Sequence, residues 1–209
     1  MWLTCGALVG AGEVQANGGW ISAYYDPGCG GRVAVYQTTA TDFSAFTGKI
    51  IANGGGHTGS GNFPSRAPGT VYQQSAGERD GEGTLTLWNG GGSAITVYGT
   101  TYTGGRTDFP VTVDPGERPS AYVDTTVVVR SGSALNITSD VTIRELEIES
   151  GARVQLNGHK LRIVSCRHRN GKGRDACGHR KGDWPGTVDY AGDGSTILWG
   201  GGGLRVIVR

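Results

Sequence analysis

The sequence predicts an all-β protein in which short parallel strands stack into a solenoid with coils of about 18–20 residues. Three observations support this fold class. Glycine is abundant, at 39 of 209 residues, and proline is scarce, at 7, while Val, Ile, Thr and Tyr separate the glycines as in short strands joined by tight turns. An Asn-Gly-Gly triplet recurs in the first half of the chain, and apolar triplets recur in the second half. A fixed period indicates stacked units.

Residues 1–99 form the first predicted region, with a repeat of 36 residues. Its markers are the triplets that begin at Asn17, Asn53 and Asn89, and the Val-Tyr-Gln sequences at 35–37 and 71–73. Asn and Gly tolerate the positive φ angles of a sharp corner, so each triplet is expected to be a corner, and the period to equal two coils of 18 residues. A hairpin is the alternative, but the glycine-rich loop at 54–61 disfavours it. Tyr36 and Tyr72 are expected to stack in register.

Residues 126–209 form a second predicted stretch of stacked strands. Apolar triplets begin at Val127, Leu135, Val141, Leu146, Val154 and Leu161. Each of the first three begins about 19–20 residues before its third successor, and this spacing predicts three short strands in each coil. Residues 100–125 break the rhythm and are interpreted as an irregular loop or junction, with a domain boundary as the alternative. A loop rich in Cys and basic residues is inserted at 165–184.

Two sets of motifs resemble a known class of proteins. Residues 30–36 (GGRVAVY), 46–55 (FTGKIIANGG) and 67–72 (APGTVY) resemble the Gly-rich repeats of large secreted right-handed parallel β-helix proteins. Residues 146–161 (LEIESGARVQLNGHKL) are similar to the coil motif of β-helix surface proteins and adhesins. The resemblance implies a right-handed parallel β-helix. It does not choose a function, because this class includes adhesins, fibre subunits and polysaccharide-cleaving enzymes.

Charge and cysteine content restrict the location and the partners. The net charge is +1, so an overall nucleic-acid-binding or membrane-binding surface is not expected, and no apolar run is long enough for a membrane-spanning helix. Four cysteines in a Gly-rich β chain favour an extracellular or cell-surface location. Cys5 and Cys29 are expected to pair across adjacent coils or to bond to neighbouring chains. Asn136 begins a glycosylation sequon. Both chain ends look like the middle of a pattern, which indicates a segment of a longer protein.

The loop at 165–184 contains the densest cluster of reactive and charged residues. Cys166 and Cys177 are expected to form a disulfide that closes a surface loop; the alternatives are free thiols and a zinc site formed by Cys166, His168, Cys177 and His179. A basic patch in the same loop could bind anionic glycans or an acidic partner, or could be a solvated protrusion without a ligand. Its residues are Arg167, His168, Arg169, Lys172, Arg174, Arg180 and Lys181.

No catalytic residues, cofactor or resident metal are expected. The acidic candidates are scattered through loops at no coil spacing, namely Asp80, Glu82, Asp108, Asp114, Asp189 and Asp193. The prediction is therefore a structural segment of an extracellular fibre, sheath or surface adhesin. It would assemble through strand edges and coil ends with copies of itself or with other segments of a longer chain. The alternatives are a carbohydrate-active β-helix enzyme and a non-catalytic glycan-binding module.

Overall fold

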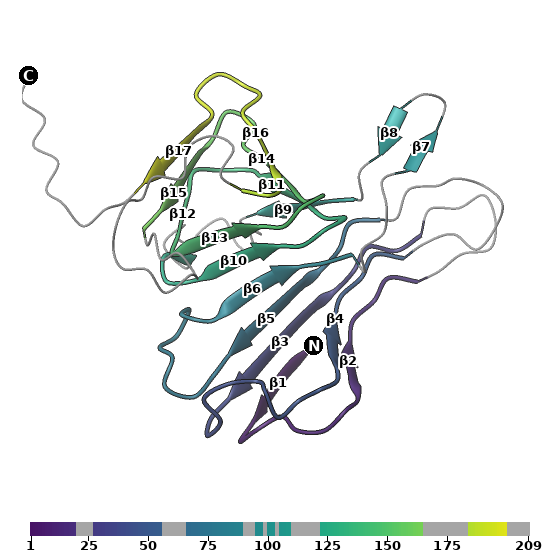
Figure 1. The fold of residues 1–209 in the computed structure, drawn as a ribbon, viewed down its shortest axis with the longest axis vertical. Coiled ribbons are helices and arrows are strands. Elements are labelled where there is room, and N and C mark those ends of the chain that lie inside the picture. Colours follow the sequence, from purple (N-terminus) through teal and green to yellow (C-terminus); the bar gives the residue numbers. More distant parts are fainter. Residues whose placement is uncertain are drawn as a thin grey trace, which may run out of the picture.

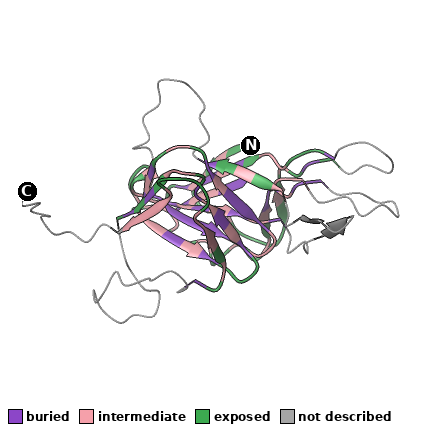
Figure 2. Ribbon diagram, turned by 90° about the horizontal axis from the view of Figure 1, so that it is seen from above, coloured by how far each residue is buried: buried purple, intermediate pink, exposed green. Residues whose placement is uncertain are grey.

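The computed structural model describes residues 1–19, 27–55, 66–89, 95–97, 100–102, 105–109, 122–164 and 184–199. These residues form strands and loops, which confirms the all-β class (Figure 1). Buried residues lie along the strands, and exposed residues gather in the loops at the periphery (Figure 2).

The largest sheet contains six strands in the order β1-β3-β5-β6-β10-β13. Their bounds are Trp2–Cys5, Arg32–Gln37, Thr70–Gln74, Thr84–Leu87, Thr126–Val129 and Glu145–Ile148. A second sheet has the order β16-β14-β11-β9, with bounds Thr187–Asp189, Arg153–Gln155, Ala134–Ile137 and Arg106–Phe109. A third has the order β12-β15-β17, with bounds Val141–Ile143, Lys160–Ile163 and Thr196–Trp199. Two further pairs are β2–β4, at Glu13–Gln15 and Lys49–Ile51, and the hairpin β7–β8, at Ile95–Val97 and Thr100–Tyr102.

In the C-terminal half, the predicted strand spacing is confirmed. Val127 pairs with Leu146 and Leu135 pairs with Val154 in parallel ladders, so each apolar triplet lies beside its third successor. Val141 pairs with Leu161 in the same way, also in parallel. Inward side chains from all three sheets form one hydrophobic core, to which fully buried side chains such as Leu87 contribute.

In the N-terminal half, the period is confirmed for one strand pair but its interpretation is wrong. Glu13 of β2 pairs with Lys49 of β4, one full repeat further along the chain, so the repeat is a single stacking step and not two coils. The second marker is displaced, because Tyr72 pairs with Ala34 and not with Tyr36. A shift of two residues keeps side chains on the same face of a strand. The rings of Tyr36 and Tyr72 therefore still contact, with centroids 5.5 Å apart, although they are not in register.

The first two Asn-Gly-Gly triplets are not positive-φ corners, and the glycines of the third, which begins at Asn89, lie outside the described residues. Among the described residues, positive φ occurs at Asn157 and at other glycines, but not in the triplets that begin at Asn17 and Asn53. The chain instead turns back beside itself: the Gly28 and Gly31 amides donate to the Gly19 and Ala16 carbonyl oxygens. The expectation of a corner is therefore wrong for the triplets at Asn17 and Asn53, where the glycines instead permit close approach of backbone segments.

The six-stranded sheet has hydrophobic cores on opposite faces of its two halves. The N-terminal core consists of Val33, Val35, Ala52 and Val71. Residues of β2 and β4 pack against this core. Val71 pairs with Thr86, whereas Tyr72 pairs with Leu85, and paired residues share a face. Leu85 and the C-terminal core therefore lie on the face opposite to Val71. The change occurs between β5 and β6, the one antiparallel neighbour pair among the described strands of this sheet.

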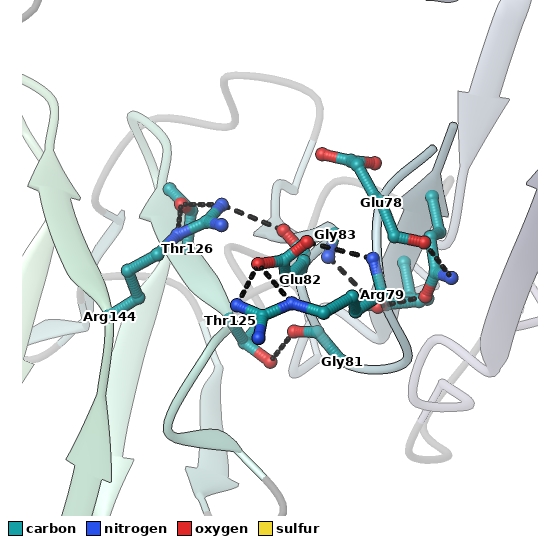
Figure 3. Close-up of polar contacts among 10 residues, drawn as sticks. Glu78, Arg79, Gly81, Glu82, Gly83, Thr125, Thr126 and Arg144 are labelled. Atoms are coloured by element: carbon teal, nitrogen blue, oxygen red, sulfur yellow. Dashed lines mark hydrogen bonds and ion pairs between the residues drawn. The ribbon is translucent and has the colours of Figure 1, made fainter. Parts of the chain in front are cut away.

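A hydrogen-bonded loop at residues 75–83 makes this reversal (Figure 3). Arg79 Nη2 lies 2.6 Å from Glu82 Oε1, and the Arg79 backbone amide donates to Glu82 Oε2. The side-chain hydrogen bond from Arg79 is the main reason that the pKa of Glu82 is lowered. Arg144 donates to the Glu82 carbonyl oxygen at 2.7 Å and to Thr126 Oγ1, so the loop is tied to the C-terminal half.

The finer prediction of a right-handed parallel β-helix stays a prediction. The described sheets do not close on one another, and β5 and β6 run antiparallel. The domain boundaries also stay predictions. The change of core face lies at 75–83, ahead of the expected junction at 100–125, and most of that junction lies outside the described residues.

Candidate functional site

Residues 165–183 of the predicted Cys and basic loop lie outside the described residues. This applies to the disulfide or zinc residues Cys166, His168, Cys177 and His179, and to the basic residues Arg167, Arg169, Lys172, Arg174, Arg180 and Lys181. In the part of the chain that the structure describes, no group of three or more His, Cys, Asp or Glu side chains could hold a metal.

Cys5 and Cys29 are both free thiols, so the expected bond between them is not formed. Cys5 pairs with Gln37 at the far end of β3, whereas Cys29 precedes the start of β3 at Arg32. The strand alone spans about 16 Å. A disulfide requires Cα atoms within about 7 Å. Bonding to a neighbouring chain stays a prediction.

The side-chain amide of the sequon residue Asn136 is part of a polar ladder on the second sheet. Asn136 Nδ2, the atom that would carry a glycan, donates to Asp108 Oδ1 at 2.6 Å. Asn136 Oδ1 accepts a hydrogen bond from Asn157 Nδ2 at 2.5 Å. A glycan on Asn136 would replace one of the two Nδ2 hydrogens, so it would have to share this atom with the bond to Asp108.

The acidic candidates are not gathered into one site by any contact among the described residues. Glu82 binds Arg79, Asp108 binds Asn136, and Asp189 accepts from the Ala191 amide. In each case the partner lies within three positions along the chain or on the neighbouring strand, so the contact is local. Asp80 and Asp193 are exposed, and Asp114 lies outside the described residues.

Strand β1 is an exposed edge of the six-stranded sheet. Within the described residues it has a strand partner on one side only, β3. Trp2 is 70% exposed, and its ring stacks on Tyr36 with centroids 4.4 Å apart and planes 22° apart. Tyr36 in turn contacts Tyr72, and burial raises the pKa of both phenols. An aromatic row therefore runs across β5, β3 and β1 and ends at the open edge.

A groove lies on the sheet face that β2 and β4 leave uncovered. It consists of two adjoining hollows of about 290 and 260 Å³, and we call it the β4 groove because β4 forms one wall. Its characteristic residues are Phe43, Phe46, Gln73, Thr86, Trp88 and Arg130.

The floor of the β4 groove follows directly from the strand register. Gln73 pairs with Thr84, Thr86 pairs with Val128, and Val128 pairs with Glu147, so these side chains share one face. Gln73, Thr84 and Thr86 are partly exposed. They present amide and hydroxyl groups to the groove.

Aromatic and charged side chains border this floor. The Arg130 guanidinium carbon lies 5.7 Å from the centre of the Trp88 ring, within cation–π range. Arg130 Nε also lies 3.6 Å from Glu149 Oε1, and Glu149 Oε2 accepts from the Ser131 amide. These two contacts position the guanidinium.

Sequence reasoning missed this groove. Phe43 and Phe46 precede β4, whereas Trp88 follows β6 and Arg130 follows β10. They meet only because the core changes face between β5 and β6. One available signal is that Thr84, Thr86 and Trp88 alternate with the apolar residues of β6.

Comparison with known proteins identifies no relative: no family model, curated protein or solved structure matches the chain. Among the described residues, no helix is long and apolar enough to span a membrane.

Proposed function

We propose that the chain is a structural segment of an extracellular fibre, sheath or surface adhesin, built as a right-handed parallel β-helix, which assembles through its open strand edges. The observation that carries this proposal is the edge strand β1, with the exposed Trp2 at the end of an aromatic row.

The backbone of β1 is suited to pairing with another strand. The Met1 and Cys5 carbonyl oxygens accept hydrogen bonds from Ala34 and Thr38 of the β3 segment. In a parallel ladder, residues alternate in the side to which they direct their N–H and C=O groups, so Trp2 and Thr4 direct theirs away from β3. An edge with unpaired backbone groups is a template for a further strand.

The side chains at this edge favour the same outcome. Tyr36 covers one face of the Trp2 ring, and the high exposure of Trp2 leaves the other side accessible. Leu3 is partly exposed and packs against the N-terminal core. An added strand would extend both the aromatic row and this core, with burial of apolar area as the driving force.

The parallel register supports the β-helical part of the proposal. Parallel pairs between one apolar triplet and its third successor recur in all three sheets around the C-terminal core. In the N-terminal half, β1, β3 and β5 are parallel and stack over the parallel pair β2–β4. Such units bury apolar surface against their neighbours, so an end unit is stabilised by a further one.

The substitution Thr4→Pro tests assembly through β1. Proline is tolerated on edge strands where its missing N–H would face outward. The substitution should therefore remove the Thr4 N–H, which points away from β3, without breaking the β1–β3 ladder. We expect sedimentation velocity to show concentration-dependent association of the unmodified chain and loss of association in Thr4→Pro. Electron microscopy should show elongated particles for the unmodified chain alone.

Thr4→Val is the matched control, because it keeps the backbone donor and removes the hydroxyl that accepts from Trp2 Nε1. It should assemble like the unmodified chain, and circular dichroism should show that both variants are folded. The proposal is contradicted if the unmodified chain stays monomeric at high concentration, or if Thr4→Pro assembles equally well.

A further inference from the structure

The β4 groove has the composition of a ligand-binding site. The groove is a hollow on an open sheet face, and the larger of its two parts, about 290 Å³, approaches the size of pockets that hold small ligands. Both parts share Phe43, Gln73, Thr86 and Arg130 as lining residues, so they form one continuous surface.

The aromatic side chains provide flat apolar surface within the groove. Phe43, Phe46 and Trp88 all line its larger part, and all three are partly exposed. Aromatic rings offer a large contact area at a small entropic cost. The C–H faces of sugar rings are the surfaces that pack on such rings.

The polar groups are suited to a ligand with many hydroxyls. Thr84, Thr86 and Gln73 come from adjacent strands and direct neutral donors and acceptors to the same face. A guanidinium carries five N–H donors in a fixed plane. The Arg130 side chain is positioned by Trp88 and Glu149. Hydroxyl groups spaced along an extended ligand would match these donors and acceptors.

The charges favour a neutral ligand. Lys49 and Arg130 line the groove together with Glu78, Glu147 and Glu149, and Arg130 is paired with Glu149. A polyanion would meet these carboxylates, and a polycation would meet the two basic side chains. Neither sign of charge dominates the lining.

The dimensions favour an extended ligand that crosses the strands. The lining runs from Val71 and Gln73 on β5 through β6 and β10 to Glu147 on β13. Three strand spacings correspond to about 14 Å.

From these observations we infer that the β4 groove binds a neutral oligosaccharide, with Phe46 and Trp88 packing against sugar rings and Gln73, Thr86 and Arg130 bonding to hydroxyls. This would be a binding function in addition to assembly, and it uses residues other than those of the basic loop at 165–184. The sugar-binding surface and the β1 edge have no residue in common.

Isothermal titration calorimetry with neutral hexasaccharides tests the inference. The probes are cellohexaose, xylohexaose and mannohexaose, with a heparin-derived hexasaccharide and an alternating Thr-Val peptide as competing classes. We expect saturable binding of at least one neutral probe. Trp88→Ala should weaken that binding about tenfold, and Thr86→Val should weaken it about threefold.

One substitution outside both proposed surfaces provides the control. Thr142→Val removes a hydroxyl from β12, which belongs to another sheet, and should leave the affinity unchanged. Thr86→Val keeps the test interpretable if Trp88→Ala does not fold, since the replacement is close in volume.

Three results would each overturn the inference. One is the absence of saturable binding to all three neutral probes. Another is binding that both groove variants retain in full. The third is binding of the heparin fragment or of the peptide alone, which would assign the surface to a different ligand class.

Discussion

Gly18 and Gly19 are adjacent residues of one triplet, but the structure places different demands on them. A Cβ atom at Gly18 would collide with the backbone of Gly28 and Gly55. At Gly19 a Cβ atom would meet nothing within 4 Å. A Cβ atom would also meet backbone at the second triplet. At Gly54 it would meet Arg66, and at Gly55 it would meet Gly19 and Gly28. The triplet therefore marks sites of close contact between backbone segments.

Substitution of these two glycines gives the first prediction. Gly18→Ala should lower the free energy of unfolding by about 2–3 kcal/mol, because backbone atoms must move to admit the methyl group. Gly19→Ala, the matched control, should change it by less than about 0.5 kcal/mol. Urea denaturation measures both. Equal effects of the two substitutions would show that the segments are not packed in this way.

Residue identity alone predicted the position of these sites but not their cause. Asn-Gly-Gly visibly recurs in the sequence, but glycine serves equally for positive φ and for close approach. The second use requires another backbone segment beside the glycine, and the local sequence does not show whether one is there. Here the neighbours of Gly18 come from residues 28 and 55, and their positions depend on how the chain returns.

At the scale of elements, the connection between β5 and β6 determines the arrangement of the two halves. Arg144, between β12 and β13, donates to Glu82 of this connection and to Thr126 at the start of β10. Thr125 Oγ1 donates to the Gly81 carbonyl oxygen in the same region. Contacts from the C-terminal half thus fix the loop in which the strand direction reverses (Figure 3).

Arg144→Met should therefore destabilise the protein. The substitution keeps much of the aliphatic chain and removes hydrogen bonds from a charged donor, each worth about 1.5–3 kcal/mol. We expect the free energy of unfolding to fall by about 2 kcal/mol in urea denaturation, less than the sum of these bonds, because the loop can relax and water can hydrate the freed acceptors. Arg162→Met on the exposed surface of β15 is the control and should be close to neutral. A neutral Arg144→Met would mean that the loop holds its position without this tie.

The elements of the C-terminal half were predictable, and those of the N-terminal half were predictable only in part. The short apolar triplets of residues 127–163 recur at an almost constant spacing, and this spacing directly gives the register. In β5 and β6 the alternation gives two possible faces without saying which one is buried. Which face is buried depends on the antiparallel pairing of Tyr72 with Leu85. The periodicity of the sequence does not predict this pairing.

At the scale of the whole molecule, one sheet supports two cores on its two faces. Each half of the sheet therefore covers one face and leaves the other open. The open face of the C-terminal half forms the floor of the β4 groove, and the open face of the N-terminal half carries the Trp2–Tyr36–Tyr72 row. Both proposed functions depend on this change of face.

A methyl and aromatic NOESY spectrum tests the change of face most directly. The structure predicts strong cross-peaks between the Tyr72 ring and the Leu85 methyl groups, and between the methyl groups of Val71 and Thr86, since each pair is directly opposed on one face. A stack with a single continuous core would instead bring Val71 and Leu85 together on its inner face. Strong Val71–Leu85 cross-peaks, with Tyr72 remote from Leu85, would contradict the arrangement of two cores on opposite faces.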